Sequence, residues 1–226
     1  LAESSTPWPE RPPLPDSWRE LTSPRAPVQL SGAGLGLYEL RSVPMVGRQQ
    51  ERDQLWERLR EVLLESHPHF SLISGAAGLG KSRLVQWLAE SAHACGAVTV
   101  LEAPGGRTAS LAEGLGPMLA RYFQTTGLDD AEMLERLETV FQRRGWSDIL
   151  ADVDRELYAD MIASATMKRR SRDRNTSFDK PREKFMAVER FIRRLCRRRP
   201  VLLWLDDVAS NRETLCLLEY LTGELA

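Results

Sequence analysis

One eight-residue pattern constrains the fold of this chain more than any other feature. Residues 75–82 read Gly-Ala-Ala-Gly-Leu-Gly-Lys-Ser, which fits GxxxxGK[ST], and they stand between an apolar run and a helical pattern. Glycines let the backbone curl so that its N–H groups and the following helix N-terminus face an anion. A glycine-rich turn is the alternative interpretation, but a chance match has a probability of only about two in a thousand. The pattern therefore predicts a phosphate-binding loop.

Each residue of this loop has a predicted role in binding a nucleotide. Lys81 carries the charge that would neutralise the β- and γ-phosphates of a nucleotide, and it is a predicted catalytic residue. Ser82 carries a hydroxyl that can ligate Mg²⁺. The predicted nucleotide contacts are Gly75, Ala76, Ala77, Gly78, Leu79, Gly80, Lys81, Ser82 and Arg83.

A second run of residues is the expected companion of the loop. Residues 201–205 are apolar throughout and lead into Asp206 and Asp207. Because ligands of parallel sheets bind beyond the carboxyl ends of the strands, both carboxylates would lie at the site. We expect Asp206 to hold Mg²⁺ through water, and Asp207 to stand where a general base for the attacking water belongs. Taken alone, the run could equally be a buried strand that enters an acidic turn.

Hydrophobic periodicity places these motifs in an α/β order. Apolar residues recur at helical spacing over 49–66 and 81–93. Residues 70–74 and 97–101 read as short buried strands. Because strand, helix and strand at this pace are typical of a parallel sheet, we predict an α/β P-loop NTPase fold with flanking helices.

A long helical insert separates the two motifs. The distance along the chain from Lys81 to Asp206 exceeds what one or two strand–helix units require, so we place an insert at about residues 104–180. It could be a partner-sensing surface or mere packing. One of its helices is expected to bury a stripe formed by Leu134, Leu137, Val140 and Phe141.

Composition limits the classes of partner. The 226 residues carry 31 basic and 32 acidic side chains, so the charge of the whole chain gives no argument for nucleic acid or for a membrane. No apolar run approaches the roughly 18 residues of a membrane helix. Three scattered cysteines indicate neither a disulfide framework nor a zinc site. We therefore expect a cytoplasmic protein without a membrane partner.

Charge is nevertheless spread unevenly along the chain. Residues 168–199 hold fourteen Lys or Arg and four Asp or Glu, and they follow a predominantly acidic segment. This stretch could grip nucleic-acid phosphates, or it could be a solvated face that balances the acidic segment. Its first part, 168–183, has almost nothing to bury and is predicted to be a loop.

The N-terminus is rich in proline. Seven of the thirteen prolines fall within the first 27 residues. Because proline fixes φ and lacks an N–H, we interpret residues 1–40 as a semi-rigid linker and 41–226 as the N-terminal part of a folded domain. A polyproline ligand for an aromatic groove is the alternative interpretation of the linker.

Together the motifs resemble a known group of proteins. The loop at 75–82 and the acidic pair look like Walker A and Walker B elements. With Val46-Gly47-Arg48-x-x-Glu51 they resemble AAA-type ATPases of the signal-transduction STAND group and their origin-recognition-like relatives. The resemblance implies ATP as the nucleotide and places Val46, Gly47 and Arg48 beside the adenine. For these three residues, a turn that opens the 49–66 helix is the alternative.

The segment before this domain adds a second resemblance. A proline-rich stretch, Gly-Leu-Gly-Leu-Tyr38 and Arg41-x-Val-Pro44 look like the junction after the kinase domain of large bacterial serine/threonine kinases. No HRD or DFG triplet occurs, so the chain has no phosphotransfer site of its own. The resemblance implies an ATP-binding switch in a bacterial signalling protein, with protein partners, its own kinase domain or a nucleotide-dependent oligomer. A DNA-associated ATPase of origin-recognition type and a non-hydrolysing ATP-binding scaffold are the alternatives.

The chain also departs from the family pattern. Position 207 is Asp, one methylene shorter than the Glu of fast AAA motors, which implies slow hydrolysis. Residues 208–212 replace a segment that usually contains tryptophan, so a contact there would be lost. The family's sensor strand and helical lid would follow residue 226, so the resemblance implies a domain truncated before both. We expect such a piece to fold poorly and to hydrolyse ATP feebly, with strand edges exposed or wrongly paired.

Overall fold

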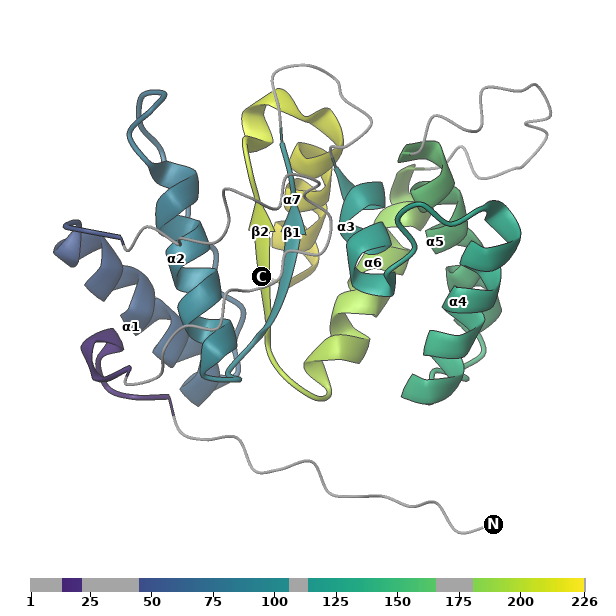
Figure 1. Cartoon of the computed structure of the whole chain (residues 1–226), viewed down its shortest axis with the longest axis horizontal. Coiled ribbons are helices and arrows are strands. Elements are labelled where there is room, and N and C mark those ends of the chain that lie inside the picture. The colour runs from purple at the N-terminus through teal and green to yellow at the C-terminus, as the bar shows by residue number, and fades with distance from the viewer. Residues whose placement is uncertain (1–13, 22–44, 106–113, 166–180, 226) are drawn as a thin grey trace, which may run out of the picture. The chain divides into compact units, whose positions relative to one another are not determined.

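Two units make up the described chain. The computed structural model describes residues 14–21, 45–105, 114–165 and 181–225 (Figure 1). Residues 14–21 and 45–99 form the first unit, and the described residues from 100 onward form the second. None of the helices in these ranges combines the length and the apolar composition that crossing a membrane requires.

The first unit is built on two helices. Helix α1 spans Gln49–Glu65 and α2 spans Lys81–Ala94, which confirms the helices predicted for these two parts of the chain. A short 3-10 helix, η1 (Trp18–Glu20), packs against α2 through the ring of Trp18. The buried apolar side chains of this unit are Trp56, Leu59, Leu84, Trp87, Leu88, Ala89, Ala92, Ala97 and Val98.

The segment between α1 and α2 differs from the prediction. Residues 70–74 form no strand, and Phe70 and Leu72 are 50% and 87% exposed. A strand is stabilised by backbone pairing with a neighbouring strand, and the described residues offer this segment no such partner. The prediction of a buried strand here is therefore wrong for this structure.

The second unit contains the sheet. Strands β1 (Thr99–Ala103) and β2 (Val201–Leu205) lie side by side and parallel, and they form the two-stranded sheet of the described residues. The strand predicted at 97–101 is present but begins and ends two residues later. Strand β2 matches its predicted range.

Helices occupy most of the chain between these strands. In the described residues they are α3 (Leu115–Phe123), α4 (Asp130–Arg144), α5 (Ala151–Ala165) and α6 (Pro181–Cys196). After β2 come a short 3-10 helix, η2 (Val208–Ser210), and α7 (Arg212–Leu225). Of the predicted loop at 168–183, residues 168–180 lie outside the described residues and 181–183 belong to α6.

Helix α4 illustrates how local signals and packing combine. Asp129 accepts the backbone N–H of Glu132, whose side chain accepts the N–H of Asp129, and this capping box fixes where the helix begins. The buried stripe is Met133, Leu137 and Phe141. Leu134 is 46% exposed, which corrects its predicted place in the stripe. Met133 and Leu134 both lie about one turn before Leu137. Helix α4 packs against α3 and α5 through the face that carries Met133, so Met133 is the one that is buried.

Aromatic rings form the centre of the second unit. Phe123 of α3 stacks on Tyr158 of α5 with ring centroids 5.7 Å apart. Phe141 of α4 meets Trp146 edge to face at 5.2 Å, and Phe191 of α6 lies 5.6 Å from Phe123. Such contacts add to the burial of apolar area, so these rings hold four helices together.

Candidate functional site

The predicted phosphate-binding loop lies in the first unit, immediately before α2. Gly78 and Gly80 have φ angles of 81° and 78°, in the left-handed region, and a Cβ at either position would meet no atom within 4 Å. Glycine is therefore needed at both positions for its backbone conformation rather than for space. Gly80 is also the N-cap of α2, so the first turn of this helix, with its backbone N–H groups, begins at the loop.

Lys81 closes this loop onto the start of α2. Its Nζ donates to the carbonyl oxygens of Gly75 and Ala76, both at 3.0 Å. The ammonium group thus stands beside the N-terminus of a 14-residue helix, where the helix dipole also favours negative charge. An ammonium, glycine N–H groups and a helix N-terminus are the donors that bind the phosphates of a nucleotide. The loop therefore fits an anionic phosphate chain.

Arg48 connects the predicted base-side turn to the loop. It adopts a left-handed conformation with φ 50° and is the N-cap of α1, so the turn does open this helix. Its Nη1 lies 3.0 Å from Oε1 of Glu51, and its Nη2 donates to the carbonyl oxygen of Leu79. Val46 and Gly47 are exposed. Contact of these three residues with adenine stays a prediction, whereas the contact of Arg48 with the loop is a new observation.

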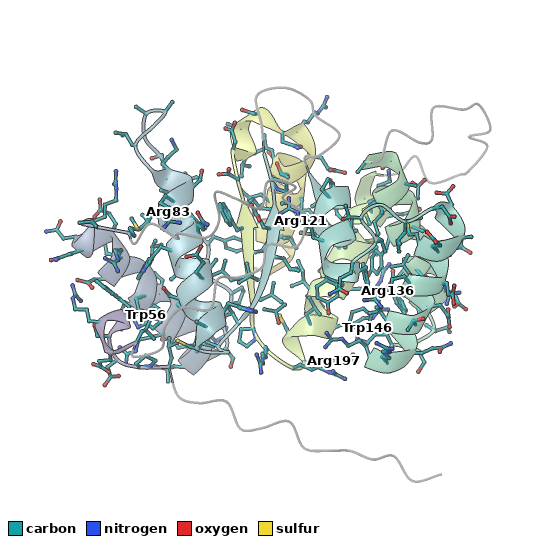
Figure 2. All side chains as sticks on the ribbon, in the orientation of Figure 1. Trp56, Arg83, Arg121, Arg136, Trp146 and Arg197 are labelled. Atoms are coloured by element: carbon teal, nitrogen blue, oxygen red, sulfur yellow. The ribbon has the colours of Figure 1, made fainter. Side chains whose placement is uncertain are left out.

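Ser82 and Arg83 lie in the first turn of α2, where Figure 2 labels Arg83. The guanidinium of Arg83 is 3.9 Å from the carboxylate of Glu90, two turns further along the same helix. Because α2 begins at the end of the loop, the hydroxyl of Ser82 lies close to the loop. A ligand for a phosphate-bound cation must have this position.

The predicted acidic pair lies in the second unit, directly after β2. The N–H of Asp206 donates to the carbonyl oxygen of Ala103 at 3.1 Å, which extends the pairing with β1 beyond the end of β2. Asp207 is exposed, takes a left-handed conformation with φ 45° and caps η2. Both carboxylates thus stand at the carboxyl end of a parallel strand, the end at which such sheets bind ligands.

Gly105 is a residue of this region that sequence reasoning missed. A Cβ at Gly105 would lie 2.0 Å from the carbonyl oxygen of Asp206 and 2.9 Å from the Cβ of Asp207. Only glycine therefore lets the chain that leaves β1 pass so close to the acidic pair. A proline–glycine step three residues after the predicted strand 97–101 was the signal that could have identified it, because such steps mark tight turns.

Asn211 and Glu213 hold the turn that follows the acidic pair. The side-chain oxygen of Asn211 accepts the N–H groups of Glu213 and Thr214 at 3.0 and 3.2 Å, so it caps α7. Oε2 of Glu213 accepts the N–H of Leu115 at 3.2 Å and fastens the start of α7 to the start of α3. Asn211, within the segment 208–212, therefore has a structural role of its own as the cap of α7.

Comparison with protein families decides the assignment. Residues 44–226 match the family of AAA ATPase domains, a range that includes the base-side turn, the loop and the acidic pair. The chain belongs to this family. Comparison with curated proteins and with solved structures gave no match. An AAA domain implies the P-loop α/β fold, in agreement with the helices and the parallel pair β1–β2, and AAA ATPase domains generally bind ATP with Mg²⁺.

The predicted residues of the AAA site fall into two groups. Residues 46–48 and 75–83 belong to the first unit, whereas Asp206 and Asp207 belong to the second. No three His, Cys, Asp or Glu side chains gather as a metal site in the described part of the chain. A hydroxyl, one carboxylate and phosphate oxygens are the hard ligands that Mg²⁺ prefers, so Ser82 and Asp206 have suitable chemistry. That they share one Mg²⁺ stays a prediction.

Proposed function

We propose that this AAA domain is an ATP-binding regulatory switch that hydrolyses ATP slowly. Residues 75–83 bind the triphosphate, Ser82 and Asp206 hold Mg²⁺, and Asp207 positions the attacking water. The observation that carries the proposal is the geometry of Lys81, whose ammonium is held 3.0 Å from two loop carbonyls at the start of α2.

Lys81 is arranged to exchange its acceptors. A phosphate oxygen is a stronger acceptor for an ammonium than a neutral carbonyl is, because charge-assisted hydrogen bonds are roughly twice as strong. When a triphosphate enters, Lys81 therefore exchanges loop carbonyls for phosphate oxygens, while the glycine conformations keep the N–H groups in place. Bound Mg²⁺ would neutralise further phosphate charge.

Asp207 is the proposed residue for water. Its carboxylate is exposed, so water reaches it, and its left-handed backbone sets the direction in which the side chain leaves the strand. The side chain of Asp is short, so it reaches less far than Glu, and slow turnover follows. Slow turnover suits a switch whose ATP-bound state must last.

The biological setting belongs to the same proposal. The segment that ends in Tyr38 and the stretch Arg41 to Pro44 support a place beside a serine/threonine kinase domain in a cytoplasmic bacterial signalling protein. In that setting the ATP-bound and ADP-bound states would be read by protein partners, by the kinase domain or through assembly with further copies.

The described part of the basic stretch, residues 181–199, gives no support to DNA binding. In α6, which carries much of the described basic stretch, three arginines are paired with carboxylates: Arg190 with Asp154, Arg193 with Glu189, and Arg194 with Asp148 and Asp154. A paired guanidinium must give up its carboxylate before it can bind a phosphate. The balancing role is therefore the better interpretation of these residues.

Three variants test the proposed function. Calorimetric titration with Mg-ATP and phosphate-release assays compare the wild-type chain with Lys81→Ala, Asp207→Asn and the control Arg58→Ala. Arg58 is an exposed cation of the same unit, paired with Glu61 and not part of the loop. We expect Lys81→Ala to lose about tenfold or more in ATP affinity. Asp207→Asn should bind ATP and lose turnover, and the control should match wild type.

Each alternative has its own outcome. Binding without turnover in wild type would favour the non-hydrolysing scaffold. Equal and appreciable turnover in wild type, Lys81→Ala and Asp207→Asn would refute the site assignment.

A further inference from the structure

A segment of the predicted linker is docked on the first unit. Residues 14–21, which we call the strap, contact one face of α1. The Nε1 of Trp18 donates to Oδ1 of Asp53 at 2.7 Å, and Arg19 forms two bonds with the same carboxylate at 2.7 and 3.0 Å. These bonds, first from Arg19 and then from Trp18, lower the pKa of Asp53. One carboxylate of α1 therefore holds two neighbouring residues of the strap.

The other end of the strap is held by the same helix. The Nε1 of Trp56, a buried residue labelled in Figure 2, donates to the carbonyl oxygen of Pro15 at 3.1 Å. Arg60 bonds to Oδ1 of Asp16 at 2.6 Å. Asp53, Trp56 and Arg60 stand at positions i, i+3 and i+7, so they share one face of α1. The strap is thus bound along two turns of helix and does not hang free as a spacer would.

Arg52 links the strap to the helix that follows the loop. Its guanidinium lies 3.4 Å from the ring centroid of Trp18 and 4.4 Å from that of Trp87 on α2. The rings of Trp18 and Trp87 meet edge to face at 5.5 Å. Arg52 is buried, and a desolvated cation is held strongly by aromatic faces. Trp18 therefore completes the surroundings of an arginine that joins α1 to α2.

Short contacts continue from Arg52 to the phosphate-binding loop. The Nη1 of Arg52 is 3.5 Å from the carbonyl oxygen of Met45, which directly precedes the base-side turn at residues 46–48. Three residues later in the chain, Arg48 donates to the carbonyl oxygen of Leu79 inside the loop. Because Arg48 is the N-cap of α1, a shift of α1 would also move the guanidinium that bonds to Leu79.

We propose that docking of the strap on α1 and α2 stabilises the loop conformation that binds ATP, so that the strap regulates ATP affinity. This inference rests on the proposed function, because it takes residues 75–83 as the ATP site. The occupant of the tryptophan- and arginine-lined face of α1 is the chain's own strap. A pull on the residues before Leu14, or a competing peptide with the same Trp-Arg pair, would release it and lower ATP affinity. By linkage, ATP must favour the docked strap by the same factor.

The first experiment measures ATP affinity by titration with a fluorescent ATP analogue in the presence of Mg²⁺. Wild type is compared with Trp18→Ala, Arg19→Glu, the conservative Arg19→Lys and the control Arg58→Ala. We expect Trp18→Ala and Arg19→Glu to bind about fivefold or more weakly, within the usual range of coupling between sites. Arg19→Lys keeps a charge for Asp53 and should stay near wild type, as should the control.

The second experiment tests the reverse effect in wild type. Amide hydrogen exchange of residues 14–21 is followed with and without Mg-ATP, and we expect ATP to slow it. If circular dichroism finds Trp18→Ala unfolded, this measurement and the ATP affinity of Arg19→Glu still test the inference. Arg19 is half exposed, so its replacement should leave the core intact.

The outcomes separate the two proposals. Equal ATP affinity in wild type, Trp18→Ala and Arg19→Glu, or exchange of the strap that ATP does not change, overturns the inference and leaves the proposed function standing. Absence of ATP binding in wild type overturns both.

Discussion

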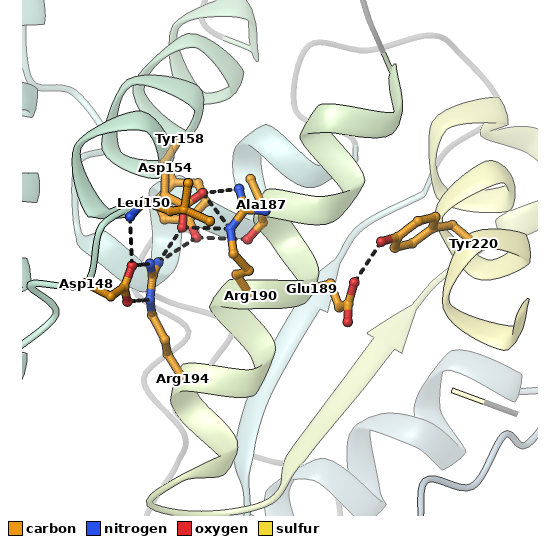
Figure 3. Close-up of polar contacts among 9 residues, drawn as sticks. All are labelled: Asp148, Leu150, Asp154, Tyr158, Ala187, Glu189, Arg190, Arg194 and Tyr220. Carbon is orange, nitrogen blue, oxygen red and sulfur yellow. Dashed lines mark hydrogen bonds and ion pairs between the residues drawn. The ribbon is translucent and has the colours of Figure 1, made fainter. Parts of the chain in front are cut away.

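The buried carboxylate of Asp154 on α5 accepts hydrogen bonds from the Nε of Arg190 on α6, at 2.9 and 3.1 Å (Figure 3). The Nη1 of Arg194, one helical turn further along α6, lies 2.7 Å from the same carboxylate. The hydroxyl of Tyr158 donates to the carbonyl oxygen of Ala187 at 2.9 Å, and burial raises the pKa of this tyrosine. A fully buried acid is thus matched by two arginines, and the pairing fixes how α5 packs on α6.

Replacement of Asp154 by Asn should destabilise the second unit strongly. The amide keeps the shape of the side chain but leaves Arg190 without its anion and Arg194 with Asp148 alone. The loss of one partner from a buried ion pair costs about 3–5 kcal/mol. Urea unfolding followed by circular dichroism measures the change in the free energy of unfolding.

Asp152→Asn is the matched control for this prediction. Asp152 lies on the same helix, pairs with Arg155 and is 83% exposed, and exposed pairs contribute only about 0–1 kcal/mol. If Asp154→Asn and Asp152→Asn unfolded at the same urea concentration, the buried ion pairs of Asp154 would stabilise this unit no more than an exposed pair does.

Acid should weaken the same unit through Asp148. Two hydrogen bonds from Arg194, at 2.8 and 3.1 Å, lower the pKa of Asp148 below its ordinary value. A carboxyl group with a lowered folded-state pKa stabilises the fold above its unfolded pKa of about 3.9, and this stabilisation is lost as pH falls through the lower folded value. Wild type should therefore exceed Asp148→Asn in free energy of unfolding at neutral pH, and the difference should shrink as pH falls below the unfolded pKa of about 3.9 and through the lower folded value.

Denaturant melts at a series of pH values test this dependence. If the difference in free energy of unfolding between wild type and Asp148→Asn stayed constant from neutral to acid pH, protonation of Asp148 would not weaken the fold, and the prediction would be wrong. Asp152→Asn serves again as the control for a general effect of charge.

Features that local sequence encodes were predicted well. The helices at 49–66 and 81–93 follow from a repeat of apolar residues, and β2 follows from five apolar residues before two aspartates. The left-handed conformations of Gly78 and Gly80 were also expected, because the glycines of the GxxxxGK[ST] pattern allow positive φ angles without steric cost. These features need only near neighbours in the chain, so periodicity and residue type suffice to find them.

Features that depend on distant partners were not predicted. The apolar run at 70–74 indicated a buried strand, but pairing decides whether a strand forms. The burial of Arg52 depends on Trp18, which is 34 positions earlier in a proline-rich stretch. The need for glycine at position 105 arises from Asp206, directly after the other strand. Of the candidate site, the loop geometry and a turn at Gly105 could be anticipated, whereas the partners that Arg48 and Gly105 meet could not.

Gly105→Ala should disturb the acidic pair. A Cβ 2.0 Å from the carbonyl oxygen of Asp206 cannot be accommodated, so the chain after β1 or the backbone of Asp206 and Asp207 must move. We expect a loss of stability of about 1–3 kcal/mol, as for other overpacked sites, together with reduced ATP turnover. Urea melts and phosphate-release assays measure the two effects.

Gly223→Ala is the control for this substitution. Gly223 lies in α7, and a Cβ there would meet no atom within 4 Å, so alanine should leave stability unchanged or raise it by up to about 1 kcal/mol. If Gly105→Ala matched the stability and turnover of this control, the close approach at Gly105 would be unimportant in solution.

Arg48→Ala should lower ATP affinity by acting on the loop. Its guanidinium holds the carbonyl oxygen of Leu79, and a hydrogen bond from a charged donor contributes about 1.5–3 kcal/mol, less where solvent competes. Because the Arg48 side chain is 38% exposed, we expect a loss in affinity near the low end, about tenfold. Glu51→Gln removes only the group that orients Arg48 and should weaken ATP binding less, in the same direction. Titration with Mg-ATP compares both with Arg58→Ala, another arginine paired at i+3, and unchanged affinity in Arg48→Ala would mean that Leu79 needs no such anchor.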